Sequence, residues 1–246
     1  MKIKKPKYYS PSTINLFVRD KAKFIMKLAD IDSFGGSPAT FRGESIEYGL
    51  IRKLFYNDEP GDIIKEVDKW FEECVISNKV EKDEKYKKEK ASLPFYIDQI
   101  LQTYNSIEEP CIGYQTKIEL ELKGVSVPIM GYIDFEFENH IRDLKTTKAI
   151  PSIVPHSVQR QLAVYSKATS KQAWVDYVSP KKTTSIRIDN VDDTISEITS
   201  ICQGIDKFLS ISDNAKELAN MFYPNLDSWE WDKDSINNAK QLWSIK

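Results

Sequence analysis

The first hundred residues have apolar side chains spaced three and four apart, which is the pattern of amphipathic helices. This pattern predicts one helix over residues 11–29, whose first turn Ser10 or Ser12 can cap. It predicts a second helix over about residues 39–56, after a loop at residues 33–38 that is rich in glycine, serine and proline. The chain is therefore expected to open with two helices.

A third helical stretch covers residues 62–107, after the helix-breaking sequence Asn57-Asp58-Glu59-Pro60-Gly61. Residues 79–90 within it are almost all charged, which is typical of a solvated helix face or loop. We therefore interpret residues at about 60–107 as a helical insertion with a hydrated charged segment.

From residue 114 onward, apolar and charged side chains alternate, which is the period-two pattern of half-buried strands. The strands expected from it cover residues 114–122, 125–137 and 141–146, with turns at Lys123-Gly124 and Glu138-Asn139. Short turns of this kind join antiparallel neighbours, so these strands are expected to form a meander.

Helical and strand patterns then alternate once more. They predict a helix over residues 155–168, strands over 173–179 and 185–188, and helices over 192–221, before a Trp-rich tail. The order helix, three-stranded antiparallel meander, helix, strand is that of a mixed α/β fold. We expect a single domain over residues 1–246, with a C-terminal helical segment at about 190–246.

Composition excludes several classes of protein. Hydrophobic residues make up 41% of the 246 residues, which is enough for a substantial core. No window supplies the roughly 18 consecutive apolar residues of a membrane span, and the basic N-terminus is not followed by the apolar run of a secretory signal. We therefore expect a cytoplasmic protein that does not bind membranes.

Cysteine content and net charge exclude further kinds of site and function. Cys74, Cys111 and Cys202 are far apart and odd in number, so they indicate neither a zinc site nor a disulfide framework. The net charge of −2 argues against a protein that coats nucleic acid nonspecifically. It leaves open an enzyme that binds a few phosphates through a local patch.

The most informative residues flank the predicted turn at Glu138-Asn139. A two-residue hairpin loop there pairs Phe137 with His140. Counting back along both strands places Asp134 opposite Asp143. Cross-strand partners have Cβ atoms about 4.5–5.5 Å apart, so the two carboxylates repel each other unless a cation lies between them.

Lys145 lies two residues after Asp143 and therefore projects from the same face. Leu144 is expected to point the other way, into apolar packing with Ile133 and Phe135. Carboxylate oxygens, a free main-chain carbonyl and an ammonium group make up a hard-cation site beside a reacting phosphate. The alternative is that this face is only the solvated side of a hairpin, and a loop of different length would also spoil the register.

A third carboxylate, Glu47, lies on the apolar stripe of the helix predicted over residues 39–56, three residues before Leu50. A carboxylate that faces a core is costly unless it is paired or bound to metal. Gly43, one turn earlier, would let another backbone approach closely. The alternative is that Glu47 lies at the edge of the stripe, where it reaches water or pairs with Arg42.

Gln161 and Tyr165 are four residues apart on the helix predicted over residues 155–168 and share a face with Val158 and Leu162. An amide and a phenol at that spacing could hold a phosphate or a water molecule beside a cation. Because Gln and Tyr are common at the edge of a core, the pair is informative only together with the carboxylates.

Together these residues resemble the RecB-like branch of the PD-(D/E)XK nuclease superfamily. The family pattern is a glycine-containing helix that ends in His or Glu, then GxxD, then (D/E)xK, then QxxxY. The matching segments, in the same order, are Gly43 to Glu47, Gly131-Tyr132-Ile133-Asp134, Asp143-Leu144-Lys145 and Gln161-Leu162-Ala163-Val164-Tyr165. Residues 10–17 are similar to the family's first helix, so the resemblance covers about residues 8–180.

The resemblance implies a restriction-endonuclease-like core and a bound Mg²⁺ or Mn²⁺. The implied metal ligands are Glu47, Asp134, Asp143 and the Leu144 carbonyl. Lys145 is implied to position or activate the attacking water and to stabilise the developing phosphate charge. Gln161 and Tyr165 are implied to shape the site and its phosphate contacts.

One departure from the family pattern concerns iron. Many relatives carry a four-cysteine iron–sulfur cluster, with one cysteine after the first helix and three near the C-terminus. Here Asp20 occupies the first position, and residues 223–243 contain no cysteine, so we predict no iron–sulfur cluster. Trp229 and Trp231 could replace the cluster by apolar packing, or could stack a base.

The chain also resembles stand-alone exonucleases of phage recombination systems, because it is short and lacks a fused helicase. This implies DNA as the partner, attack at DNA ends, and a bacterial or phage-infected host cell. The basic residues of the segment 79–90 could contact DNA, although its acidic residues dilute their field. The analogy leaves open a homo-oligomer or a single-strand annealing partner.

Three other functions remain open at this stage. The first is a structure-specific or restriction-type DNA endonuclease, which the same catalytic residues would serve. The second is a catalytically inactive module of the same fold that binds DNA ends. The third is a calcium-binding protein that is not a nuclease, against which Lys145 argues.

Overall fold

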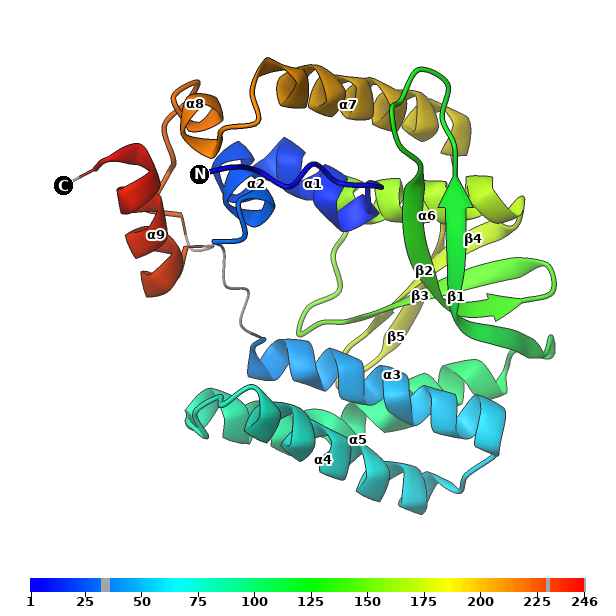
Figure 1. Ribbon diagram of the computed structural model, residues 1–246. Helices are drawn as coiled ribbons and strands as arrows, with labels where there is room; N and C mark the ends of the chain where they lie inside the picture. Colours follow the sequence, from blue (N-terminus) through cyan, green and yellow to red (C-terminus); the bar gives the residue numbers. More distant parts are fainter. Residues whose placement is uncertain (32–35, 229–230, 246) are drawn as a thin grey trace.

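The protein is described by a computed structural model over residues 1–31, 36–228 and 231–245. In these residues a mixed sheet of five strands lies between two groups of helices (Figure 1). The strands, in their order across the sheet, are β1 (Cys111–Leu120), β2 (Ile129–Phe137), β3 (His140–Thr146), β4 (Gln172–Val178) and β5 (Thr183–Arg187). Only β3 and β4 are parallel, and helix α6 (His156–Thr169) connects them. The expected α/β class is confirmed.

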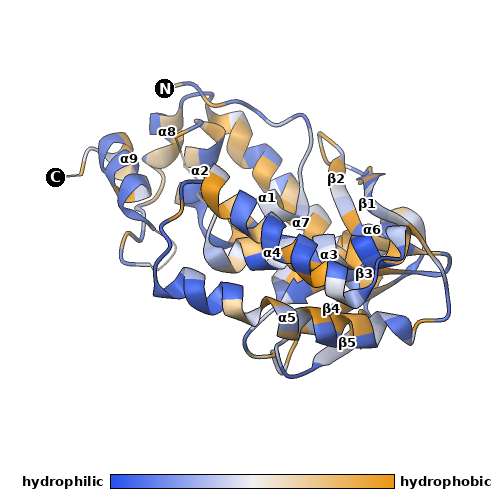
Figure 2. Cartoon of the chain, turned by 90° about the horizontal axis from the view of Figure 1, so that it is seen from below, coloured by the Kyte–Doolittle hydropathy of each residue, from blue (hydrophilic) through white to orange (hydrophobic). Residues whose placement is uncertain are grey.

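The two groups of helices build separate hydrophobic clusters on the two sides of the sheet. One group comprises α1 (Pro11–Arg19), α2 (Lys21–Leu28), α6, α7 (Val191–Ile211), α8 (Ala215–Ala219) and α9 (Lys233–Trp243). The other comprises α3 (Pro38–Tyr56), α4 (Pro60–Ser77) and α5 (Glu84–Asn105). Figure 2 shows the hydrophobic residues concentrated in the strands and the helices beside them, whereas α9 is mainly hydrophilic.

The helix expected over residues 11–29 is wrong in one respect, because it is two helices that meet at Asp20. The backbone of Asp20 is extended, with φ −149° and ψ 97°. Its Oδ1 accepts hydrogen bonds from the backbone N–H groups of Ala22 at 2.9 Å and Lys23 at 3.0 Å. A side chain that satisfies the free N–H groups of a new helix favours this break over a continuous helix.

The other expected helices are largely as predicted. α3 confirms the helix over residues 39–56 within one residue, and α6 confirms the helix over 155–168. The stretch 62–107 divides into α4 and α5, and the stretch 192–221 divides into α7 and α8. Each division falls at polar residues that can cap the following helix, as Asp83 does for α5.

The charged segment over residues 79–90 is mostly exposed, as expected, but Glu89 is not. Only 4% of Glu89 is exposed, and its carboxylate pairs with Arg42 and with Lys148. Arg42 is also buried, stacks on the ring of Tyr96 and donates to the carbonyl of Thr146 at 3.3 Å. A buried ion pair therefore holds α5 and α3 to the end of β3.

The Trp-rich tail packs against the start of the chain. Trp231 is 6% exposed, and its indole N–H donates to Asp20 Oδ2 at 3.0 Å. Lys23 Nζ lies 5.2 Å from the centre of the same ring. Apolar packing is thus the role of Trp231, whereas Trp229 lies outside the described residues. In the described part of the chain, no helix is both long and apolar enough to span a membrane.

Candidate functional site

Strand β2 changes the face that it presents to the helices at Asp134. Before that residue, Ile133 packs in the cluster of α6, and after it, Phe135 packs against Tyr104 of α5, with ring centres 5.7 Å apart. Opposite Asp134, Gln115 has a left-handed backbone with φ 48° inside β1. The expectation that Ile133, Phe135 and Leu144 share one face is therefore wrong, because Ile133 packs in one hydrophobic cluster and Phe135 and Leu144 pack in the other.

The register predicted for the hairpin is correct. Phe135 pairs with Arg142 and Glu136 with Ile141, which continues to Asp134 opposite Asp143. At that point the backbone N–H of Leu144 bonds to a side chain rather than to the backbone of β2. It donates to Asp134 Oδ2 at 2.9 Å. The N–H and C=O of one strand residue point to the same side, so the Leu144 carbonyl also points toward Asp134.

Asp143 is completely buried and lies between two side chains. Its Oδ2 is 2.7 Å from Lys145 Nζ, which makes an ion pair. Its Oδ1 accepts a hydrogen bond from Gln161 Nε2 at 2.9 Å. Because the Lys145 side chain is 33% exposed, its ammonium group connects the buried carboxylate to the surface.

Helix α6 contributes an amide and a phenol to the same site. Gln161 Nε2, besides binding Asp143, donates to Tyr165 Oη at 3.2 Å. The ring of Tyr165 fills the space beside Gly131, where an added Cβ would lie 2.6 Å from Cε1 of the ring. The glycine of the GxxD segment therefore makes room for the tyrosine of the QxxxY segment.

Glu47 approaches from the other group of helices, on α3. Its Oε1 accepts a hydrogen bond from Gln115 Nε2 in β1. The alternative pairing of Glu47 with Arg42 is wrong, because Arg42 pairs with Glu89 instead. Gly43 does lie close to a neighbour, since an added Cβ would be 3.3 Å from Thr146 Oγ1 at the end of β3.

Burial raises the pKa of each of the three carboxyl groups here. The pKa of Asp134 is raised well above its ordinary value by burial first, then by the charges of Asp143 and Glu47. Burial raises the pKa of Glu47, with a further contribution from Asp143 and partial compensation by the Gln115 hydrogen bond. Burial also raises the pKa of Asp143, which Lys145 counteracts.

The ammonium and the phenol of the site respond to the same charges. Burial alone would lower the pKa of Lys145, but the carboxylates of Asp143 and Asp134 raise it above its ordinary value. Burial, with the charge of Asp143, raises the pKa of Tyr165 to about 12. At neutral pH, Lys145 is therefore charged and Tyr165 is protonated.

The oxygen atoms of this site are of the chemical type that binds a hard divalent cation. They are carboxylate oxygens that repel one another, and a main-chain carbonyl that points toward Asp134. Across residues 1–31, 36–228 and 231–245, however, no three His, Cys, Asp or Glu side chains are grouped closely enough to hold a metal ion. Gln115 and Lys145 occupy Glu47 and Asp143, so cation binding requires these side chains to move.

The structure thus joins Asp143, Lys145, Gln161 and Tyr165 by direct contacts, and Asp134 by its bond to Leu144. Glu47 contacts Gln115 instead and acts on Asp134 and Asp143 only through its charge. The sequence did not identify Gln115 or Tyr177, which also belong to the site. The sequence around Gln115 does not indicate its role, because a left-handed backbone is unusual for a residue in a strand and is not expected there. Tyr177 of β4 is paired in register with Lys145 of β3, a parallel pairing that period-two alternation alone does not identify.

Comparisons with known proteins identify neither a family nor a function for this chain. No protein family and no curated protein matches the chain. Among solved structures, the crystal structure of SSO0001 resembles it over 76% of this chain and 84% of that one, with 10% sequence identity and a TM-score of 0.37. A likeness this weak says nothing about function.

The contact between Gly131 and Tyr165 can be tested by Gly131→Ala. The new methyl group overlaps the ring, so we expect a loss of about 1–3 kcal/mol in the free energy of unfolding, measured with urea. Replacing Tyr165 by Leu in the same protein should recover part of that loss, since the two residues are in contact.

Gly61→Ala is the matched control, because nothing lies within 4 Å of a Cβ added in that first turn of α4. It should leave the free energy of unfolding unchanged or slightly higher. Equal stability of the Gly131→Ala and Gly61→Ala proteins would contradict the packing described.

Proposed function

We propose that this protein is a metal-dependent DNA nuclease with a PD-(D/E)XK core, which hydrolyses phosphodiester bonds from DNA ends. The observation that carries the proposal is the convergence of Asp134, Asp143 and Lys145 at one point of the sheet. Two buried carboxyl groups with raised pKa values are costly to ionise, and a bound cation is the ordinary reason for keeping them.

The cation would be Mg²⁺ or Mn²⁺, held by Glu47, Asp134, Asp143 and the Leu144 carbonyl. When bound, it supplies a Lewis acid that polarises a phosphoryl oxygen and lowers the pKa of water. An iron–sulfur cluster is not part of the proposal, because Asp20 at the corresponding position caps α2 and binds Trp231.

The chain's own residues would act around the phosphate. Lys145 is charged and partly exposed, so it can bind a phosphate oxygen and stabilise the charge that develops during hydrolysis. Gln161 orients Asp143 through its amide, and its second contact fixes Tyr165 against Gly131. This arrangement limits how far the carboxylate can turn when Lys145 moves to the phosphate.

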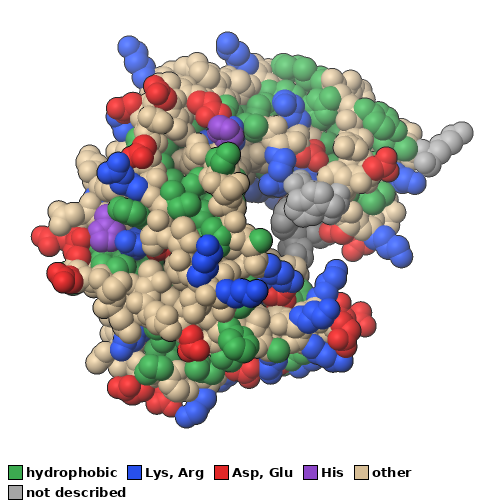
Figure 3. Space-filling model, turned by 180° about the vertical axis from the view of Figure 1, so that it is seen from behind, with side chains coloured by type: hydrophobic (Ala, Val, Ile, Leu, Met, Phe, Trp, Pro, Cys, Tyr) green, Lys and Arg blue, Asp and Glu red, His purple; other side chains and the backbone are tan. Residues whose placement is uncertain are grey.

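DNA is supported as the partner by the surface near the site. Seen from behind, Lys and Arg side chains lie along part of the edge of the opening between the two groups of helices, next to some Asp and Glu side chains (Figure 3). Local positive charge of this kind attracts phosphate even when the net charge of the chain is −2. The preference for DNA ends rests on the likeness to stand-alone exonucleases alone.

The proposal predicts that cleavage requires a divalent cation and a DNA end. End-labelled linear DNA should be degraded with Mg²⁺ or Mn²⁺, whereas covalently closed circles survive, and excess chelator should abolish the reaction. The measurement is the release of label and the loss of circles on the same gel. Full activity in chelator excludes the proposal, and rapid nicking of closed circles identifies an endonuclease instead.

The roles of Asp134 and Lys145 predict different effects on catalysis and binding. Asp134→Asn and Lys145→Ala should each reduce single-turnover cleavage by at least ~10²-fold, since each removes a positioned group. In metal-free titrations, Asp134→Asn should bind DNA as tightly as the wild type or more tightly, because it removes repulsion. Lys145→Ala should bind slightly more weakly, because it removes one cation.

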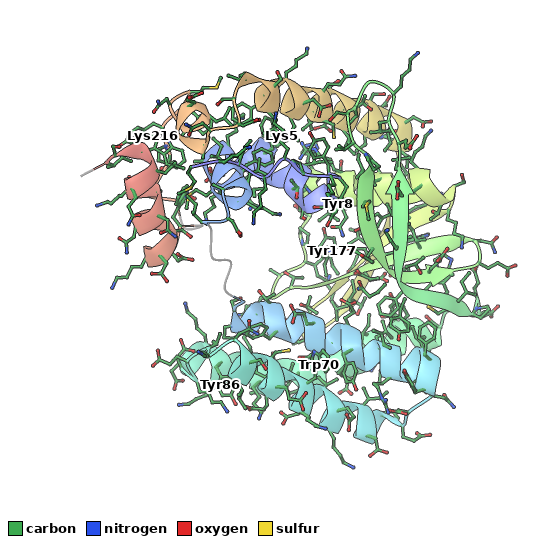
Figure 4. The ribbon with its side chains drawn as sticks, viewed as in Figure 1. Lys5, Tyr8, Trp70, Tyr86, Tyr177 and Lys216 are labelled. Carbon is green, nitrogen blue, oxygen red and sulfur yellow. The ribbon has the colours of Figure 1, made fainter. Side chains whose placement is uncertain are left out.

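Lys216→Ala is the matched control, because Lys216 lies on α8, far from the sheet (Figure 4). It removes the same charge and should cleave like the wild type. If Lys145→Ala cleaves within a few-fold of the Lys216→Ala protein, the hairpin is only a solvated face. If no protein in the set cleaves but all bind DNA ends, the chain is a binding module.

A further inference from the structure

The hydroxyl group of Tyr177 lies in the site without a partner. Tyr177 is 4% exposed, and its Oη is buried without a hydrogen bond among the described residues. A buried hydroxyl that makes no hydrogen bond opposes folding, and Phe would fill the same volume without that penalty. A bound ligand that accepts a hydrogen bond from this hydroxyl would explain why tyrosine is present here.

Other buried tyrosines of the described chain each have a partner. The hydroxyl of Tyr104 donates to Asp176 at 2.8 Å, that of Tyr96 to the Thr147 carbonyl at 2.9 Å, and that of Tyr9 to Asp206 at 2.6 Å. Tyr86 donates to Glu72, and Tyr165 accepts from Gln161. An unpaired hydroxyl is thus not a general feature of tyrosines in this protein.

Tyr177 lies on the same face of the sheet as the charged groups of the site. It is the register partner of Lys145 across the parallel pair of β3 and β4, so both side chains project from the same face. Asp143 and Lys145 are also the charged groups that act on its hydroxyl. Figure 4 shows Tyr177 on the sheet side of the space between α1 and α3.

These neighbours select the chemistry of the ligand. A phenol that stays protonated is a hydrogen-bond donor, and burial together with the charge of Asp143 raises the pKa of Tyr177. An anionic oxygen beside Lys145 is attracted by the ammonium group and can accept from the phenol at the same time. A phosphate oxygen satisfies both conditions, whereas a cation cannot accept a hydrogen bond from the phenol.

We propose that Tyr177 is a phosphate-binding residue, whose hydroxyl donates a hydrogen bond to a phosphate oxygen of bound DNA next to Lys145. This deepens the proposed nuclease function and rests on DNA being the ligand of the site. Because the hydroxyl is buried, this contact requires the side chains that cover it to move, as cation binding also does. Strand β4 then contacts the substrate directly, in addition to the residues supplied by β2, β3, α3 and α6.

The test compares Tyr177→Phe with wild type in DNA binding and in thermal unfolding. The probe is a fluorescein-labelled linear duplex, titrated with Ca²⁺ in place of Mg²⁺, since calcium binds oxygen ligands with less strict geometry. We expect roughly ten-fold or greater loss of affinity, as for a hydrogen bond to a charged group, with an unfolding midpoint unchanged or raised.

Tyr104→Phe is the matched control, because it removes a buried hydroxyl that has a protein partner. It should lower the unfolding midpoint and bind the duplex like the wild type. The inference is overturned if Tyr177→Phe binds the duplex with wild-type affinity, or if its unfolding midpoint falls as that of Tyr104→Phe does.

Parallel cleavage assays separate this inference from the proposed function. A wild type that binds the duplex but never cleaves it refutes the nuclease, while the affinity of Tyr177→Phe still decides the role of Tyr177. A wild type that neither binds nor cleaves refutes both. Cleavage by wild type with equal affinity in the variant refutes the Tyr177 inference alone.

Discussion

The hydrogen bond from the Leu144 N–H to Asp134 Oδ2 is the interaction on which the rest of the site depends. It ends the backbone pairing of β2 with β3 and substitutes a carboxylate for a carbonyl. The same substitution directs the Leu144 carbonyl toward Asp134 and brings a second carboxylate, Asp143, into electrostatic contact. A regular hairpin would have satisfied these backbone groups internally and left no oxygen donors for a cation.

The change of face in β2 at this point also explains why the site lies between two hydrophobic clusters. Residues before Asp134 pack against α6, and residues after it pack against α5. Side chains from both groups of helices can therefore reach the same carboxylates, Gln161 from one side and Glu47 from the other. The buried pair of Arg42 and Glu89 holds α3 beside the end of β3, which keeps Glu47 within reach.

Most of this arrangement could be predicted from the sequence, because local patterns determine it. The two-residue turn at Glu138-Asn139 fixed the register of Asp134 and Asp143, and helical spacing placed Gln161 beside Tyr165. The change of face in β2 could not be predicted, since period-two alternation places Ile133 and Phe135 on the same side of the sheet. The break at Asp20 and the burial of Glu89 depend on tertiary partners, which short-range periodicity does not contain.

The central claim is that ionising the buried carboxyl group of Asp134 lowers stability, and that a bound cation offsets this cost. Its pKa is raised in the folded protein, so the cost is absent below 3.8, grows as pH rises from 3.8 to the raised value, and stays constant above that value. The direct measurement is the thermal unfolding midpoint of wild type and Asp134→Asn at pH 8, with and without Mn²⁺. Asparagine can still accept the Leu144 N–H. The account predicts that the metal-free variant is as stable as wild type or more stable, and that Mn²⁺ stabilises only the wild type. A destabilised variant, with equal stabilisation of both proteins by Mn²⁺, would contradict it.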